Sequence, residues 1–364
     1  MSPDVGERDF NLAFNEGWSA MVASPKRVQP ALLSAKQISE LTQRERLLYN
    51  DARSVWHANL GPYLTPDMVR VIDELDTIVQ SNRQDGDRVR SAALLDAYPG
   101  LGKTTLAVHY GVQFHREQLE IHGPETADGN PRIPVAYIRL TSNTSMRSLN
   151  AMLCRFYAHP SADRGNATLL GARASECARV AATRLIIADD VHFLDMQRRD
   201  GREVANHFKW LANEFAVTFM FVGVGMAERG LLTEGLGVDK AQYAQTARRW
   251  TRTSISPFSL QSAEDRKTWR RLLLAIERDL VLANKYPGML ADDLADYLFA
   301  RSTGHFASLM ALIKRGCFRA IKTGDERLTQ TLLDGIRNDV ASEQARVNLE
   351  SMMRTGHLSA RLTG

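Results

Sequence analysis

The most constraining feature of the sequence is a glycine-rich run that separates an apolar segment from a helical one, Ala97-Tyr98-Pro99-Gly100-Leu101-Gly102-Lys103-Thr104-Thr105. Two glycines let backbone N–H groups turn inward around an anion, and the start of the next helix adds the positive end of its dipole. Lys103 can reach phosphate oxygens, and the Thr104 hydroxyl can bind Mg²⁺. The run predicts a phosphate-binding loop in which residues 98–105 contact ATP. The alternative is a glycine-rich turn with Lys-Thr by chance.

The loop departs from the usual pattern at one position, because Ala97 stands where the first glycine is expected. An alanine fits there if its φ is negative.

A second element lies further along the chain, where the apolar run Leu185–Ala188 ends in Asp189 and Asp190. At the carboxyl end of a strand, Asp189 is predicted to hold the hydrated Mg²⁺, and Asp190 to orient or deprotonate the attacking water. Alone, such a pair often marks a turn, and its weight comes from the pairing with Lys103. Most ATPases of this layout have Glu at the second position. The shorter Asp190 therefore predicts slow ATP hydrolysis.

The order of apolar and helical segments predicts the fold class. Near-continuous apolar runs are typical of strands that are buried on both faces of a parallel sheet, and amphipathic segments between them predict crossover helices. The expected strands are 91–97, 135–140, 185–188 and 217–224, and the expected helices are 104–122, 145–157, 168–182 and 202–215. We expect an α/β fold with a P-loop core, a parallel sheet between helices, an N-terminal helical extension and an all-helical C-terminal domain.

Breaks in these patterns divide the chain into four predicted parts. Residues 1–85 form an N-terminal arm and helical extension, and little periodicity before residue 34 predicts a loosely held arm. Residues 86–257 form the α/β nucleotide-binding domain, and 258–341 the helical lid. Residues 342–364 are a C-terminal tail, which either serves a protein partner or is disordered.

The composition excludes some classes of protein. Of the 364 residues, 44% are hydrophobic and 24% charged, which is a globular balance. The longest apolar stretch, Phe215–Ala227, is too short to span a bilayer. The first 20 residues lack the apolar core of a secretory signal, and the three cysteines lack paired spacing, so we expect a cytoplasmic protein with reduced thiols.

A third candidate element is the segment Gln245–Trp250, which contains Arg248 and Arg249. In ATPases that form rings or filaments, an arginine here reaches the γ-phosphate held by the neighbouring subunit and stabilises the transition state. Arg249 is the first candidate and Arg248 the second. The alternative is a basic pair at the surface. Between residues 248 and 280, eight basic residues face four acidic ones, which indicates either a contact with phosphates or a solvated helix face.

Two expected polar residues are missing. Val224 occupies the position at the end of the fourth strand where many such ATPases place a polar sensor, and Ala307 replaces the arginine that often opens a lid helix. Both departures predict weak hydrolysis, which favours a nucleotide switch over a fast motor.

The order of these parts resembles the AAA+ ATPases that regulate DNA transposition, of the TnsC/TniB type, which are related to MuB. The resemblance covers about residues 40–336. Beyond the two nucleotide motifs, it rests on runs around Arg44-Glu45-Arg46 and Trp56-His57, on Lys209-Trp210-Leu211-Ala212-Asn213-Glu214-Phe215, on Phe221–Gly225 and on Gln245–Phe258. It implies an oligomer, either a ring or a helical filament, that assembles on duplex DNA with ATP, recruits a transposase and disassembles on hydrolysis. A target-selection protein is a further implied partner.

In such proteins the DNA is held by sequence-independent contacts to its backbone. The matching segment here is the loop Thr141-Ser142-Asn143-Thr144-Ser145-Met146-Arg147, in which Thr141, Ser142, Asn143, Thr144 and Arg147 are the candidate DNA contacts. The alternative, equally weighted, is that Ser142 or Thr144 merely caps the next helix.

Two other classes of function share this core. The first is an AAA+ switch in defence, signalling or replication-initiator-like loading, without a transposase. The second is a nucleotide-binding scaffold that does not contact DNA.

Overall fold

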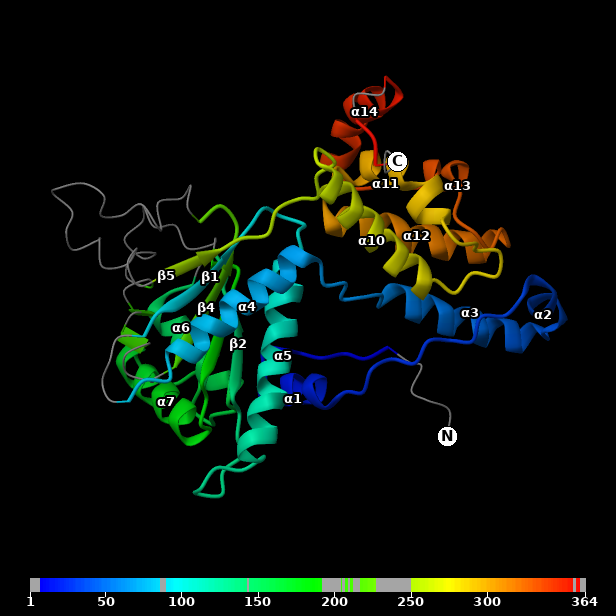
Figure 1. The fold of residues 1–364 in the computed structure, drawn as a ribbon. Coiled ribbons are helices and arrows are strands. Elements are labelled where there is room, and N and C mark those ends of the chain that lie inside the picture. Colours follow the sequence, from blue (N-terminus) through cyan, green and yellow to red (C-terminus); the bar gives the residue numbers. More distant parts are fainter. Residues whose placement is uncertain are drawn as a thin grey trace, which may run out of the picture.

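The computed structural model describes residues 7–85, 90–142, 144–191, 204, 207–208, 210–211, 217–226, 250–355 and 358–360. The α/β unit lies on the left of Figure 1 and the helical lid at the upper right, and the N-terminal helices are divided between the two parts. Each part has its own hydrophobic core. No helix within these ranges has the length and apolarity needed to cross a bilayer.

The α/β unit is built on a five-stranded sheet with the order β2-β3-β4-β1-β5, in which every pairing is parallel. The predicted α/β fold with a parallel sheet is confirmed. Residues of β1, β3 and β4 are buried along the whole strand, as their continuous apolar runs predict. The strands are β1 (Ala92–Asp96), β2 (Val135–Arg139), β3 (Leu185–Asp189), β4 (Thr218–Gly223) and β5 (Trp250–Thr253).

Strand β5 was not expected from the sequence. It has only four residues, and its two central ones, Thr251 and Arg252, are exposed. A short strand at the edge of a sheet shows neither a long apolar run nor clean alternation, which explains why its sequence pattern is weak.

Four helices of the α/β unit are described with their bounds, and three of them begin after a residue whose side chain caps the helix. Thr65 caps the helix that opens with Pro66, and Ser145 and Asn166 cap two others through their side chains. Of the helix expected over 202–215, the described residues 204, 207, 208, 210 and 211 are helical. The four helices are α4 (Pro66–Ser81), α5 (Lys103–His122), α6 (Met146–Phe156) and α7 (Ala167–Val180).

The prediction of a loosely held N-terminal arm is wrong for α1 (Asn15–Ala23). This helix packs on α5, and the Trp18 side chain is fully buried in the core of the α/β unit. The Trp18 indole N–H donates to His115 Nδ1 at 3.0 Å, and its ring stacks on Tyr137 with 6.1 Å between centroids. Trp18 is the large side chain that attaches this segment to the core. One apolar residue does not produce the periodic apolar pattern by which a helix is recognised in a sequence.

The next N-terminal helices, α2 (Ala35–Glu40) and α3 (Gln43–Ala58), lie on the side of the lid (Figure 1). Helix α3 packs against α12 (Phe306–Thr323). The buried Arg53 guanidinium forms a bidentate pair with Glu326 at 2.6 and 2.9 Å. Nearby, His57 Nε2 accepts a hydrogen bond from the backbone N–H of Val281 at 2.9 Å. Polar contacts that are shielded from water therefore join the N-terminal extension to the lid.

The remaining lid helices are α10 (Ala263–Asp279), the π-helical turn η2 (Met289–Asp293), α11 (Ala295–Ser302), α13 (Gln330–Asp334) and α14 (Val340–Arg354). Helix α14 crosses the predicted boundary between residues 341 and 342, so the expectation of a separate tail is wrong for its described residues. It packs on α11, where Glu343 Oε1 accepts from the buried Arg301 at 2.8 Å. Its polar sequence gives little apolar signal because ion pairs, including Arg346 with Asp334 at 2.7 Å, make much of the contact.

Candidate functional site

The glycine-rich run forms the turn between β1 and α5. Gly100 and Gly102 have φ angles of +76° and +86°, a region that side chains with a Cβ rarely adopt. Gly102 is also the N-cap of α5, so the free N–H groups of the first helical turn face this loop. Ala97 is not among the described non-glycine residues with positive φ, so an alanine sits there without strain. The backbone thus has the shape of an anion cradle.

Lys103 lies inside this cradle. The residue is 9% exposed, and its Nζ donates to the carbonyl of Tyr98 at 2.7 Å. Loss of hydration lowers the pKa of Lys103, while the charges of Asp189, Asp96 and Asp190 act in the opposite direction. A buried ammonium that, among the described residues, donates to a neutral carbonyl alone is well suited to a phosphate group. Thr104 is partly exposed next to it and Thr105 is exposed.

The carboxylate pair lies at the carboxyl end of β3, as predicted. Asp189 is 1% exposed, and its carboxylate accepts from the Tyr137 hydroxyl at 2.8 Å and from the N–H of Asp190, also at 2.8 Å. Asp190 has a φ of +59°, which is uncommon for a residue with a side chain. Such local strain is often found at functional sites.

Two residues of β2 that the sequence did not single out contact this pair. The Tyr137 hydroxyl donates to Asp189. Burial raises the pKa of Tyr137 above its ordinary value, so the hydroxyl keeps its proton and remains a donor. Arg139 is 59% exposed, and its Nε lies 3.5 Å from Asp190 Oδ2 while one terminal nitrogen lies 3.9 Å from Asp189. Neither residue belongs to a local motif, because β2 meets β3 only through the sheet register that pairs Arg139 with Asp189.

A second ion pair lies at the end of β1, directly before the loop. The buried Asp96 accepts from the backbone N–H of Met226 at 3.0 Å, and Arg252 on β5 lies 3.2 Å from its other oxygen. Asp96, Arg252 and Tyr98 line a cavity of about 410 Å³. Val224 lies at the end of β4, so the expected sensor position has no polar side chain. The sequence signal for Asp96 was its place at the carboxyl end of the first strand.

The lid touches the loop directly. The backbone N–H of Ala307, in the first turn of α12, donates to the carbonyl of Gly100 at 2.9 Å. Gly102 lies between Met68 of α4 and Phe306 of α12. A cavity of about 340 Å³ opens beside them, and its lining includes Leu101, Thr65 and Asp265. The loop is thus held between the N-terminal helix α4 and the lid.

The residues expected to contact DNA are only partly brought together. Thr141, Ser142 and Arg147 are exposed after β2, whereas Thr144 is 6% exposed and its hydroxyl accepts from the N–H of Thr141 at 2.8 Å. The Arg147 guanidinium donates to the carbonyls of Gly165 and Asp163.

The helix cap in this loop is Ser145, so the alternative prediction of a cap at Ser142 or Thr144 is wrong. Asn143, Arg248 and Arg249 lie outside the described residues.

The basic segment after residue 248 is a solvated helix face in its described part. On α10, Lys267 and Arg271 lie near Glu264, at 3.7 and 3.4 Å, and Arg270 pairs with Asp292 at 2.9 Å. Arg278 lies 3.4 Å from Asp279. These contacts compensate the positive charge of the helix within the lid itself.

Comparisons with known proteins agree with this geometry. A family model described as an AAA domain matches residues 87–231. No curated protein sequence matches the chain. Among solved structures, the Aeropyrum pernix ORC2 protein (ADPNP–ADP complexes) is 12% identical with a TM-score of 0.55, covering 79% of this chain and 70% of that one. The Aeropyrum pernix ORC1 protein in complex with DNA is 14% identical with a TM-score of 0.52, covering 82% and 68%.

A third similar structure is Cdc6p from Pyrobaculum aerophilum, which is 18% identical with a TM-score of 0.51 and covers 75% of this chain and 67% of that one. At such identities the likeness shows the fold alone. The chain therefore contains an AAA domain, a P-loop ATPase module, within an AAA+ fold that is similar to that of the ORC and Cdc6 proteins.

Proposed function

We propose that this chain is an ATP-dependent DNA-binding AAA+ protein that assembles on duplex DNA, recruits or activates a transposase, and disassembles when ATP is hydrolysed. The observation that carries the nucleotide-switch part is the hydrogen bond between Ala307 of the lid and Gly100 of the phosphate loop. Because the lid bonds to the loop itself, a phosphate that reshapes the loop also changes the position of the lid.

The residues of the site have separate roles in this proposal. The Lys103 ammonium exchanges the Tyr98 carbonyl for the β- and γ-phosphates of ATP, and the loop N–H groups bind the same oxygens. Thr104 and Asp189 would hold Mg²⁺, which neutralises charge on the phosphates when bound. Few protein ligands are needed, since Mg²⁺ keeps waters and phosphate oxygens in its coordination shell. Within the described residues, no three His, Cys, Asp or Glu side chains form a metal site of their own.

Hydrolysis depends on Asp190. Its carboxylate accepts a proton from the attacking water, and this requires release from Arg139, which lies 3.5 Å away. Arg249, or Arg248, reaches the γ-phosphate held by a neighbouring subunit, so that hydrolysis requires assembly. Because the Asp190 side chain is shorter than that of Glu and lies beside Arg139, we expect slow ATP hydrolysis.

Two lines support the part of the proposal that concerns DNA and the transposase. One is the sequence resemblance to the TnsC/TniB type, and the other is the fold shared with the ORC1 protein whose structure contains DNA. Thr141, Ser142 and Arg147 remain our candidates for contacts to the DNA backbone. The three structural relatives are ORC and Cdc6 proteins, which favours replication-initiator-like loading as the second candidate function.

Electron microscopy and light scattering of the chain with linear duplex DNA test the proposal under three conditions, with ATP, with ADP and without nucleotide. We expect rings or filaments only with ATP and DNA, and none with Lys103→Ala or Arg249→Ala. Co-sedimentation with a transposase encoded beside this chain then separates the two candidate functions. A monomer under every condition would contradict the proposal. Assembly without transposase binding would favour the loader.

A further inference from the structure

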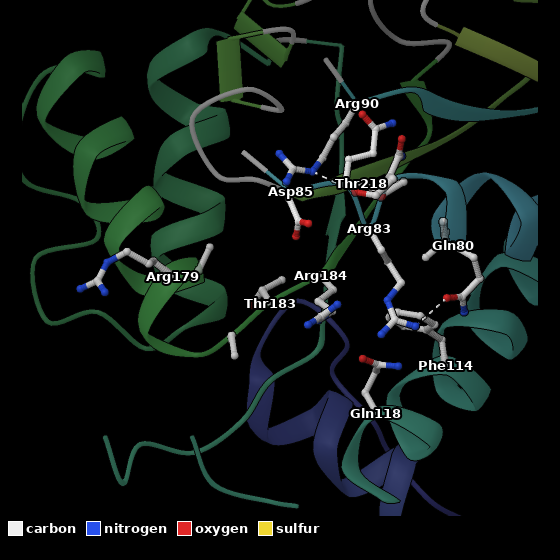
Figure 2. A pocket seen from close by; sticks show the side chains of 15 residues that line it. Gln80, Arg83, Asp85, Arg90, Phe114, Gln118, Arg179, Thr183, Arg184 and Thr218 are labelled. Carbon is white, nitrogen blue, oxygen red and sulfur yellow. Dashed lines mark hydrogen bonds between the residues drawn. The ribbon is translucent and has the colours of Figure 1, made fainter. Parts of the chain in front are cut away.

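A second cavity, of about 470 Å³, lies at the amino ends of the strands, whereas the phosphate loop follows a carboxyl end. Figure 2 shows the side chains that line it. Its wall is made at the amino ends of β1, β3 and β4, by Arg90, Arg184 and Thr218. The phosphate loop follows the carboxyl end of β1, so the two sites are about 17 Å apart along a five-residue strand. A nucleotide seated on Lys103 does not account for this cavity.

The cavity has a surplus of positive charge. Among the described residues that line it, Arg83, Arg90, Arg179 and Arg184 face one carboxylate, that of Asp85. The arginines come from three different parts of the fold: the end of α4, the segment before β1, and the segment from α7 to β3. In Figure 2 the side chains of Arg83, Arg90 and Arg184 lie around one opening.

Three of these guanidinium groups form no ion pair with a carboxylate among the residues that the structure describes. Arg83 donates to the Gln80 side-chain carbonyl at 3.1 Å and Arg90 to the backbone carbonyl of Asn82 at 3.3 Å, which are neutral acceptors. Arg184 makes no side-chain hydrogen bond or ion pair with any residue that the structure describes. Loss of hydration and repulsion by Arg83 and Arg132 lower the pKa of Arg184, as expected for cations gathered without a counter-charge.

The fourth arginine, Arg179, has an ordinary structural role. Arg179 lies in the last turn of α7, where a cation is favoured by the helix dipole, and it pairs with Glu176 through two bonds of 3.0 and 2.6 Å. Arg184 has neither feature, since it directly precedes β3 and has no carboxylate partner in the described chain. Neutralisation of a helix end therefore explains Arg179 and leaves Arg184 unexplained.

A buried amide points to the same place. Gln118 of α5 is 6% exposed and lines the cavity, and its side chain forms no hydrogen bond within the described residues. The polar atoms of this amide are not sealed from solvent, so the amide is open to the cavity and can donate to a ligand there. Beside it, the buried side chains of Val79 and Phe114 form an apolar floor.

We infer that this cavity binds a small molecule that carries a terminal phosphate or pyrophosphate group. Guanidinium groups bind phosphate oxygens in pairs, and three of them with an amide donor suit a group with three terminal oxygens better than a carboxylate with two. The apolar floor holds the uncharged part of the ligand. The volume is that of a small-molecule site, and it is too narrow to admit a nucleic-acid duplex.

Isothermal titration of the full chain with inorganic pyrophosphate, in the Lys103→Ala background that silences the phosphate loop, tests this inference. We expect binding of one pyrophosphate per chain, weakened about tenfold or more by the further change Arg184→Gln. The matched control Arg179→Gln changes an arginine of the same cavity that is already paired, and should alter binding less than twofold. Circular dichroism confirms that each variant is folded.

A chemical readout locates the site. Phenylglyoxal modifies accessible arginines, and pyrophosphate should protect Arg184 and Arg83 from it while Arg179 reacts at an unchanged rate. Absence of binding, or binding that Arg184→Gln leaves intact, would overturn the inference. It would also be overturned if Arg184→Gln weakened only the binding of duplex DNA, because the arginines would then belong to a nucleic-acid surface.

Discussion

The burial of Trp18 makes a strong prediction about the N-terminal segment. Its side chain is fully buried, stacks on Tyr137 and donates a hydrogen bond to His115. Replacing a buried tryptophan with alanine leaves a cavity and costs about 3–5 kcal/mol. The buried His115 nitrogen also loses its donor, which places the expected loss for Trp18→Ala at the upper end of that range.

Urea unfolding of the full chain, followed by far-UV circular dichroism, measures this loss. The control is Phe14→Ala, an aromatic residue of the same segment that is 40% exposed and whose loss should cost less than about 1 kcal/mol. If the segment were loosely held, both variants would unfold at the urea concentration of the wild type. Equal midpoints would therefore refute the assignment of Trp18 to the core.

Three further predictions follow from two residues beside the carboxylate pair and from two buried histidines. Tyr137→Phe removes the donor to Asp189, so it should raise the Mg²⁺ concentration needed for half-maximal ATP hydrolysis and leave Mg²⁺-free nucleotide binding unchanged. Arg139→Gln should raise the hydrolysis rate a few-fold, because it frees the second carboxylate, and an unchanged or lower rate would contradict this role. Burial lowers the pKa of His57 to about 3 and of His115 to about 4, so the unfolded chain binds protons first as the pH falls. The stability that the two neutral histidines contribute is complete above about pH 6.5. As the pH falls from 7 to 5, the free energy of unfolding should therefore decrease by about 4 kcal/mol for the two together. Denaturant titrations show whether His57→Gln halves this loss.

The sequence predicted the parts of the site that lie close together along the chain. Residues 98–105 form one local turn, and Asp189 and Asp190 end one apolar strand, so composition and spacing are enough to find them. Tyr137 and Arg139 could not be found in this way, because only the pairing of β2 with β3 brings them to the carboxylates. Local patterns do not encode sheet register between distant strands.

The errors at the two ends of the chain have a similar origin. Helix α1 is held by Trp18, and α14 is held by the pairing of Glu343 with Arg301. In both cases a few contacts with distant parts of the chain replace the periodic apolar face that sequence reasoning requires. The edge strand β5 was missed because four residues with an exposed centre do not form a recognisable pattern.

Equilibrium binding of a fluorescent ATP analogue, with Mg²⁺ and in parallel with Lys103→Ala, tests the central claim most directly. The account predicts one site per chain in the wild type and a loss of at least a hundredfold in affinity in the variant, because the ammonium that meets the phosphates is gone. Lys322→Ala, which changes an exposed lysine in the last turn of α12, should bind as the wild type does. Equal binding by the wild type and Lys103→Ala would contradict the assignment of the phosphate loop.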